Sequence, residues 1–288
     1  MENRELKKKL SAIKQLPALP RVVSHVLQLL QNPDSTAHEI GAAISQDQAL
    51  ASKVLRTANS AFYGFPRKIT TINYAIVVLG LNNIKNIVLS STIINGFSTS
   101  SSDGIFDRRA FWEHSLACGI FARKLSVHLG MKNSEEVFMW GLLHDFGKVV
   151  LDIYFHEEFI QAVELSRTEQ TPLSTAEFEV FGFNHSGVGA LLLRKWSMPL
   201  PLVKAVEYHH QPDQDHSAFR IASIVHAADY LCRRLAIGSG GDGTLPALNK
   251  KAWKLMGISA DEVKQLSKEV LEEFALATEF LNEVEKAE

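Results

Sequence analysis

Apolar residues recur at intervals of three and four positions along most of the chain, and no segment shows a sustained alternation of apolar and polar residues. The segment after Pro20 is an example, with apolar side chains at Val22, Val23, Val26, Leu27, Leu29 and Leu30. This spacing places apolar side chains on one face of a helix, whereas a half-buried strand requires alternation. The pattern therefore predicts an all-α protein.

Residues typical of helix starts and of turns divide this pattern into separate helices. We expect helices to begin at Pro20, at capping boxes formed by Thr36 with Glu39 and by Ser45 with Gln48, and at Ser134, which precedes Glu135 and Glu136. Turn-forming residues interrupt the helical pattern at four places, which are residues 59–66, 98–104, 198–201 and 238–243. The chain is thus predicted to fold as many helices joined by turns.

Two of these breaks are also predicted to separate larger parts of the chain. The serine-rich run at residues 98–104 neither packs in a core nor continues a helix. We therefore expect a smaller N-terminal helical subdomain over residues 1–100 and a larger one over residues 101–240. Beyond the glycine-rich run at residues 238–243, apolar residues at helical spacing predict that residues 241–288 pack onto the body of the protein.

Composition and charge narrow the class of protein. The 288 residues are 46% hydrophobic and 22% charged, as expected for a globular protein with a substantial core. Basic and acidic side chains nearly balance, at 30 and 32, so no overall positive charge attracts the chain to nucleic acid or to an anionic membrane. Polar residues interrupt the most apolar stretch, residues 74–97, so we expect no membrane span there.

The cysteine content and the N-terminus predict a location. Only Cys118 and Cys232 are present, too few for a disulfide framework, which favours a reducing compartment. The charged N-terminus is not followed by the apolar stretch of a secretory signal. We therefore expect a cytoplasmic protein.

The predicted larger subdomain contains several histidine and aspartate residues that could bind a metal, and together they span about 115 positions of the chain. They are His114, the adjacent His144 and Asp145, His185, the adjacent His209 and His210, and Asp229. Imidazole and carboxylate ligands suit iron, manganese, zinc or nickel, and cysteine is not part of this predicted ligand set. Ligands this far apart in sequence can still meet, because helix bundles assemble metal sites from several inward-facing helices.

The adjacent His144 and Asp145 carry the strongest of these signals. They follow the apolar residues 140–143 and precede Gly147, so both polar groups fall on a predicted core face. Burying a neutral polar group without a partner costs roughly 1 to 3 kcal/mol, and burying a charge costs more. A metal ion would supply the partner, and the alternative is that the two side chains bond to each other or to a helix end.

The other candidates also have simpler structural interpretations. His114 fits a core histidine bonded to a backbone carbonyl, His185 a helix cap, and the histidine pair before Pro212 a helix C-terminus. His226 lies three residues before Asp229, on the same helical face, and is an alternative ligand or the partner of a ligand.

The ordered set His, His-Asp, His, His-His, Asp, with Gly147 and Lys148 after the first pair, resembles the HD superfamily of metal-dependent phosphohydrolases. Four N-terminal segments are more specifically similar to the HDOD family. These segments are Leu-Pro-Ala-Leu-Pro at residues 16–20, Ile-Ser-Gln-Asp-Gln-Ala-Leu at 44–50, Ala-Asn-Ser-Ala-Phe-Tyr-Gly at 58–64, and residues 75–81 with their Leu-Gly step. Together the two resemblances cover roughly residues 15–235.

This resemblance implies a bacterial signalling protein in which a multi-helix HD-like bundle follows a smaller N-terminal helical block. It also implies one divalent metal ion or two, and action through contacts with a signalling protein partner. The ligand order is similar to that of the HD-GYP phosphodiesterases. However, residues 211–215 contain no Gly-Tyr-Pro triplet, and Ala110 stands where those enzymes tend to have a glutamate. Hydrolysis of cyclic di-GMP is therefore disfavoured.

The alternative function is a working metal-dependent phosphohydrolase that acts on a nucleotide or phosphodiester. A phosphate-containing small molecule would then be a ligand. Asp145 would bridge the metal ions or orient the nucleophile, and Lys148 would offset charge on the phosphoryl oxygens. Neither a membrane nor a nucleic acid is an expected partner. Asn59 and Ser60 are interpreted as a helix C-cap, and the alternative is a contact surface.

Overall fold

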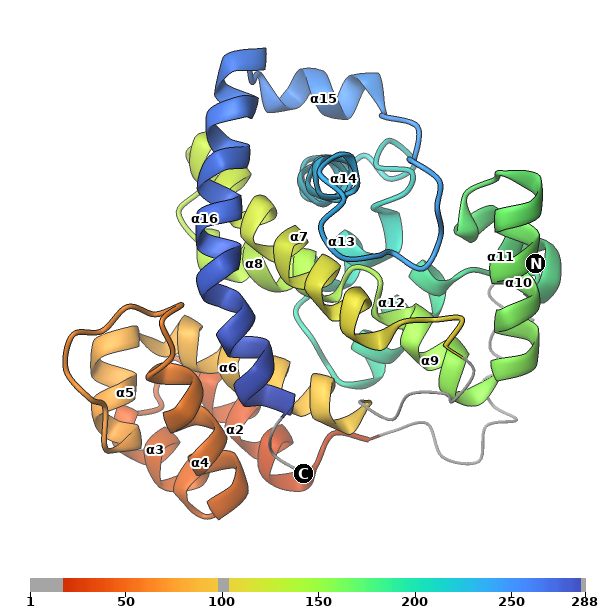
Figure 1. Ribbon diagram of the computed structural model, residues 1–288. Coiled ribbons are helices and arrows are strands. Elements are labelled where there is room, and N and C mark those ends of the chain that lie inside the picture. Colours follow the sequence, from red (N-terminus) through yellow and green to blue (C-terminus); the bar gives the residue numbers. More distant parts are fainter. Residues whose placement is uncertain (1–17, 98–103, 286–288) are drawn as a thin grey trace. The chain divides into compact units, whose positions relative to one another are not determined.

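The computed structural model describes residues 18–97 and 104–285 (Figure 1). Every regular element in these ranges is a helix, and they contain no strand. The prediction of an all-α protein is therefore confirmed. The chain forms two compact units, one made of residues 99–270 and the other of residues 18–98 with the chain from Leu271 onward.

The unit that starts at residue 18 is built from five consecutive helices. They are α2 (Arg21–Gln31), α3 (Ala37–Ser45), α4 (Gln48–Ala58), α5 (Ile72–Leu79) and α6 (Leu81–Gly96). Helix α6 packs against α2, α4 and α5, and α3 packs against α2, α4 and α5. Fully buried aliphatic side chains such as Ile40, Ile44, Ile84 and Ile87 fill the space between these helices.

Local capping chemistry explains where these helices begin, and it corrects one prediction. The Thr36 capping box is confirmed, because the Glu39 amide donates to Thr36 Oγ1 and the Thr36 amide donates to the Glu39 carboxylate. The predicted Ser45 box is wrong. Ser45 is the last residue of α3 and donates its hydroxyl to a carbonyl within that helix. The carboxylate of Asp47 caps α4 instead, accepting from Leu50 N at 3.0 Å.

Asn59 is the C-cap of α4, as predicted, and it also holds the following loop. Its side-chain nitrogen donates to Leu55 O at 2.7 Å and to Ile69 O at 2.8 Å. Its side-chain oxygen accepts from Ile69 N at 2.8 Å. One amide side chain thereby satisfies backbone groups at both ends of the predicted break at residues 59–66.

The apolar stretch at residues 74–97 folds as α5 and α6, which are bent by 119° where they meet. None of the helices in the described ranges is by itself long and apolar enough to cross a membrane. Helices α5 and α6 reach that length and apolarity only when they are counted together.

The unit formed by residues 99–270 holds the predicted metal ligands. Its helices are α7 (Arg108–His128), α8 (Ser134–Leu143), α9 (Phe146–Tyr154), α10 (His156–Glu169), α11 (Leu173–Phe181), α12 (His185–Lys195), α13 (Leu200–Tyr208), α14 (Phe219–Arg234), α15 (Lys250–Met256) and the first part of α16 (Ala260–Glu285). Helix α7 packs against α8 and α14, α9 packs against α12, and α13 packs against α12 and α14 (Figure 1). Helix α15 packs against α14.

The predicted breaks in this unit are found with small shifts. Helix α8 begins at Ser134, as predicted, and Asn133 precedes it. Helix α13 begins at Leu200, and Pro201 is tolerated in its first turn, where a missing N–H group leaves no hydrogen bond unmade. The glycine-rich run lies between α14 and α15 in a segment without helix. Residues 98–103 of the serine-rich run lie outside the described residues.

Candidate metal centre

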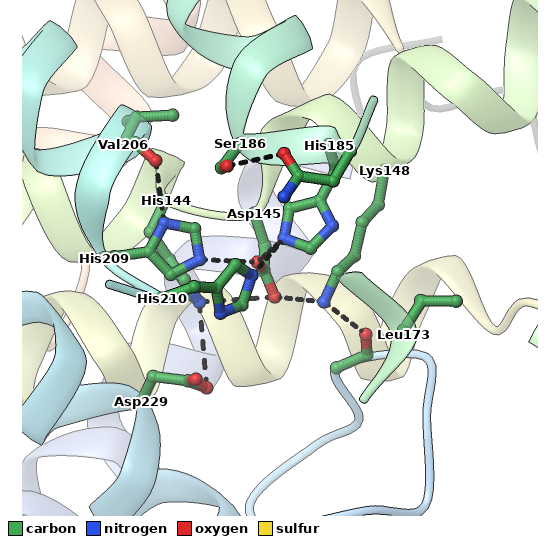
Figure 2. A network of polar contacts seen from close by, with 12 residues as sticks. His144, Asp145, Lys148, Leu173, His185, Ser186, Val206, His209, His210 and Asp229 are labelled. Carbon is green, nitrogen blue, oxygen red and sulfur yellow. Dashed lines mark hydrogen bonds and ion pairs between the residues drawn. The ribbon is translucent and has the colours of Figure 1, made fainter. Parts of the chain in front are cut away.

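The seven predicted ligands come from five places in the chain and meet inside one unit. Figure 2 labels all of them except His114. His114 lies in α7, His185 is the first residue of α12, and Asp229 lies in α14. The histidine pair 209–210 directly follows α13. Six of the seven residues are at most 2% exposed, and His210 is half-buried.

His144 and Asp145 lie at a junction of two helices rather than inside one helix, which the sequence had suggested. Helix α8 ends at Leu143 and α9 begins at Phe146. The chain departs from helical geometry at Asp145, where ψ is 3°. Both adjacent side chains are therefore able to face the same interior, since neither has to follow the rotation of a continuous helix.

Gly147 permits the close approach of α9 and α12 that brings Asp145 to His185. A Cβ atom at Gly147 would lie 1.9 Å from His185 O and 2.7 Å from His185 C. Contacts this short with backbone atoms are not allowed, so only glycine fits at this crossing.

The possible ligand atoms form two groups, and within each group they lie within 4.8 Å of one another. Group one consists of His114, Cys118, His144 and Asp229, and group two consists of Asp145, His185, His209 and His210. The sequence analysis left cysteine out of the ligand set, and the structure places the sulfur of Cys118 in group one.

Asp229 is the carboxylate of group one. Its Oδ1 lies 3.1 Å from His114 Nε2 and 3.8 Å from His144 Nε2. Asp145 is the carboxylate of group two, and its Oδ1 lies 3.0 Å from His185 Nε2 and 3.4 Å from His209 Nε2.

The two groups touch where His144 meets Asp145. His144 Nε2 lies 3.3 Å from Asp145 Oδ2 (Figure 2). His210 lies at the outer side of group two, with its Nε2 2.8 Å from His185 Nε2.

Several buried atoms at this centre make no well-oriented hydrogen bond in the described chain, although a carboxylate oxygen lies 3.1 to 3.4 Å from each of the three nitrogens. They are Nε2 of His114, His144 and His209, and Oδ1 of Asp145. A buried polar atom without a partner is costly, and such atoms are normally satisfied by protein, water or an ion. Three imidazole nitrogens and a carboxylate oxygen directed at one region are the donor set that a divalent transition-metal ion prefers. The residues present therefore fit a metal ion.

Contacts at the far side of each ring fix the orientation of the imidazoles. His144 Nδ1 lies 2.7 Å from Gly141 O, and His209 Nδ1 lies 2.8 Å from Val206 O. A carbonyl oxygen only accepts hydrogen bonds, so in each ring Nδ1 carries the proton. When the ring is neutral, as it is when it binds a metal, its Nε2 lone pair is directed at the centre. Burial lowers the pKa of His144, but interactions led by the carboxylate of Asp145 outweigh burial and hold this pKa well above its usual value, so metal binding at His144 displaces a proton.

His226 belongs to this support rather than to the ligands. Its Nδ1 donates to His209 O at 2.8 Å, and its Nε2 accepts from Asn249 N at 2.9 Å. Both ring nitrogens are engaged by backbone groups, so His226 has no lone pair left for a metal. Of the two alternatives in the sequence, the partner of a ligand is the one that the structure favours.

Lys148 and Arg233 place two positive charges beside the carboxylates. Lys148, which is fully buried, donates to Asp145 Oδ2 at 2.6 Å and to Gly240 O at 2.8 Å. Arg233 donates through Nε to Asp229 Oδ1 at 2.8 Å and is also paired with Asp242. The sequence analysis missed Arg233, although its position four residues after Asp229 places both on one helical face.

These charges keep the carboxylates ionised. Burial disfavours the charged form of Asp145, but His144 and Lys148 hold its pKa well below the usual value. Burial likewise disfavours the charge on Asp229, and the Arg233 guanidinium holds the pKa of that carboxyl well below its usual range.

Burial has the opposite consequence for two of the histidines and for the thiol. It lowers the pKa of His114, and it lowers the pKa of His209 to about 4, so both rings are neutral at pH 7. Burial raises the pKa of Cys118 well above its usual value, so without a metal its sulfur is a neutral thiol.

Glu177 is a further residue that the sequence analysis missed. Its Oε2 accepts from His185 Nδ1 at 2.6 Å and from His185 N at 2.8 Å. The carboxylate, which is fully buried, fixes the ring and makes Nε2 a stronger donor to a metal. Glu177 lies in α11 and His185 begins α12, so only the three-dimensional structure reveals this contact between two helices.

Glu177→Gln is therefore expected to weaken metal binding by about 10- to 100-fold without unfolding the protein. Glutamine can still accept hydrogen bonds from His185, but it brings no negative charge. Competition with a chromophoric chelator measures the affinity. The matched control is Glu179→Gln, an exposed position on the same helix, which should bind metal like the unchanged chain. Equal affinities for both variants would contradict the role of Glu177.

A cleft of about 670 Å³ opens beside His210. Residues of α11, α12, α13 and the following loop line it, including the aromatic side chains of Phe178 and Tyr208. Its lining also contains the ion pair between Arg194 and Glu207. His210 is the one member of the two groups that lines this cleft.

Comparison with known families accounts for this combination of fold and ligands. The model of the HDOD domain matches residues 16–212, which is more than half of the chain. The chain belongs to the HDOD family. The HDOD match ends before Asp229 and Arg233, so these two site residues lie outside the matched region.

Individual relatives agree with this assignment. An HDOD domain protein of unknown function from Geobacter sulfurreducens is 26% identical to this chain, with a TM-score of 0.80. The match covers 100% of this chain and 98% of that protein's chain. A candidate phosphohydrolase from Shewanella amazonensis SB2B is 23% identical, with a TM-score of 0.77 and coverage of 97% and 98% of the two chains. At 23% identity, the similarity to the Shewanella protein shows a shared fold alone.

A curated relative with no described function, from Treponema pallidum (strain Nichols), is 28% identical over 199 residues. These residues make up 69% of this HDOD chain. The match spans only 38% of the length of that relative.

Proposed function

We propose that this HDOD protein is a regulatory module of bacterial signal transduction that binds a divalent metal ion at its centre and acts through contacts with a protein partner. The observation that carries the proposal is the set of buried Nε2 and Oδ1 atoms at His114, His144, Asp145 and His209 that make no well-oriented hydrogen bond. A metal ion in group one would satisfy the nitrogens of His114 and His144, and a metal ion in group two would satisfy Asp145 and His209. We place the protein in the cytoplasm, because both of its cysteines are free thiols.

The burial of the centre favours regulation over turnover. Six of the seven predicted ligands are at most 2% exposed, so a phosphoester has no open approach to them in this conformation. The two cations that would stabilise a phosphoryl group are already engaged, Lys148 by Asp145 and Gly240 O, and Arg233 by Asp229 and Asp242. A closed, internally neutralised metal site is typical of structural or sensing roles.

The second candidate function is a metal-dependent phosphohydrolase acting on a nucleotide or phosphodiester. The cleft beside His210 supports it, since this cleft would give a substrate access to group two. A bound divalent ion would supply Lewis acidity and an acidified water. Asp145 would orient the nucleophile, and Lys148 would have to leave its partners to reach the phosphoryl oxygens.

Metal analysis and an activity panel test these alternatives on the full chain. Protein purified without added metal is expected to contain a transition-metal ion, and chelator is expected to lower its Tm by about 5 to 10 °C. This shift corresponds to roughly 2.7 kcal/mol of ligand stabilisation when the ion is present at about 100 times its Kd. Nucleotides and phosphodiesters should not be turned over.

The other outcomes decide between the two candidate functions. Turnover that chelator abolishes would favour the phosphohydrolase. Absence of bound metal, together with a Tm that neither chelator nor added metal changes, would overturn the metal centre in both candidates.

A further inference from the structure

Cys118 is the one member of group one that is not among the ligands predicted from the sequence. It lies four residues after His114 in α7, so the two side chains share one face of the helix. Its side chain is fully buried, and its sulfur lies within 4.8 Å of the ligand atoms of the other three members of the group. A buried thiol alone is not evidence of a metal site. In the same group, however, the buried Nε2 atoms of His114 and His144 make no well-oriented hydrogen bond, and a metal ion would satisfy them.

The dimensions of group one are close to those of a four-coordinate site. Bonds of about 2.0 Å to nitrogen and oxygen and about 2.3 Å to sulfur give roughly 3.3 to 3.6 Å between tetrahedral ligands. Asp229 Oδ1 lies 3.1 Å from His114 Nε2 and 3.8 Å from His144 Nε2. Small side-chain rotations are enough to close the group around one ion.

The charges at group one favour a second negative ligand. Asp229 and Asp242 carry two negative charges, and Arg233, which pairs with both, carries one positive charge. These three side chains together carry one net negative charge, which balances only one of the two positive charges of a divalent ion. The ring of His114 is neutral and adds no charge. A thiolate at Cys118 supplies the missing charge, and buried charges are tolerated when they are compensated locally.

We propose that the thiolate of Cys118 is the fourth ligand of the ion in group one, with His114, His144 and Asp229, and that this sulfur makes the site a zinc site rather than a magnesium or manganese site. On binding, the Cys118 S–H bond breaks, its proton passes to the solvent, and the sulfur electron pair forms the bond to the metal. Thiolate ligands select zinc and similar ions, whereas carboxylate and water ligands suit magnesium and manganese. The proposal rests on the metal centre proposed above.

Cys232 gives this assignment a matched control. It lies in α14, three residues after Asp229, and is as fully buried as Cys118. Each thiol affects the pKa of the other, yet the sulfur of Cys232 is not a member of group one. Cys118→Ser and Cys232→Ser therefore make the same chemical change in neighbouring places, and only the first removes a proposed ligand.

Cobalt(II) is the probe, because it replaces zinc and reports a sulfur ligand through a charge-transfer band in the near ultraviolet. Metal-free full-length protein is titrated with cobalt and then with zinc. The unchanged chain and Cys232→Ser should both develop the band, saturating at one ion per chain. Cys118→Ser should lose the band and bind zinc at least about 100-fold more weakly, because residues outside the coordination shell already contribute 10- to 100-fold.

The outcomes separate this proposal from the metal centre itself. Cobalt that binds to the unchanged chain without the sulfur band would overturn the role of Cys118 and leave the metal centre standing. No binding of cobalt or zinc would overturn both. If Cys118→Ser does not fold, Cys118→Ala and the spectrum of the unchanged chain still decide the question.

Discussion

Asp145→Ala is expected to prevent metal binding at group two and to destabilise the protein by about 3 to 5 kcal/mol. Asp145 contacts imidazoles of both groups and is ion-paired to Lys148 within the core. Its loss would leave the Lys148 ammonium, which is fully buried, without a counter-charge, and breaking a buried pair from one side costs about this much. Elemental analysis and urea unfolding measure the two effects.

Two further variants separate the loss of the ligand from the loss of the fold. The double variant Asp145→Asn with Lys148→Met removes both charges, so it should recover most of the stability and still bind no metal at group two. Asp213→Ala changes an exposed aspartate of the same unit and should leave the metal content unchanged. Full metal content in Asp145→Ala would reject Asp145 as a ligand.

Gly147→Ala is expected to have the second large effect, a loss of about 3 kcal/mol or more together with loss of metal. The added methyl group would lie 1.9 Å from His185 O and 2.7 Å from His185 C. Backbone atoms cannot rotate away, so α9 and α12 would have to separate, which also moves Asp145 away from His185. Urea unfolding and metal content provide the test.

Other glycines provide a graded comparison for this prediction. Gly189→Ala meets a side-chain atom, Val206 Cγ1, at 3.0 Å, so a smaller loss is expected. Gly96→Ala, near the end of α6, meets nothing within 4 Å and should change stability by at most about 1 kcal/mol, in the stabilising direction. The same stability for Gly147→Ala as for Gly96→Ala would show that the crossing of α9 and α12 does not depend on glycine.

The fold was largely predictable because helical spacing is a local property of the sequence. The Thr36 capping box and the breaks beside Asn59 follow from neighbouring residues, and they were found where expected. The Ser45 box failed because Asp47, two residues later, competes for the same helix start with a carboxylate. The local sequence identifies both Ser45 and Asp47 as possible N-caps, but it does not determine which of them caps α4.

The candidate site was predictable in its ligands and less so in its surroundings. The order of histidines and aspartates identified seven residues that do lie together. Cys118 and Arg233 each lie four residues from a predicted ligand on the same helix, so helical spacing contained a signal for both. Glu177 and Gly240 reach the centre through tertiary packing alone, which no spacing in the sequence encodes.

Anomalous X-ray diffraction from crystals of the full chain, grown without added metal, tests the central claim most directly. The account predicts an anomalous peak within bonding distance of His144 Nε2, surrounded by the other members of group one, at the absorption edge of a transition metal. It also predicts that no peak lies among the members of group two in crystals of Asp145→Ala with Lys148→Met. Density with no anomalous peak, and with water molecules hydrogen-bonded to Nε2 of His114, His144 and His209, would contradict the account.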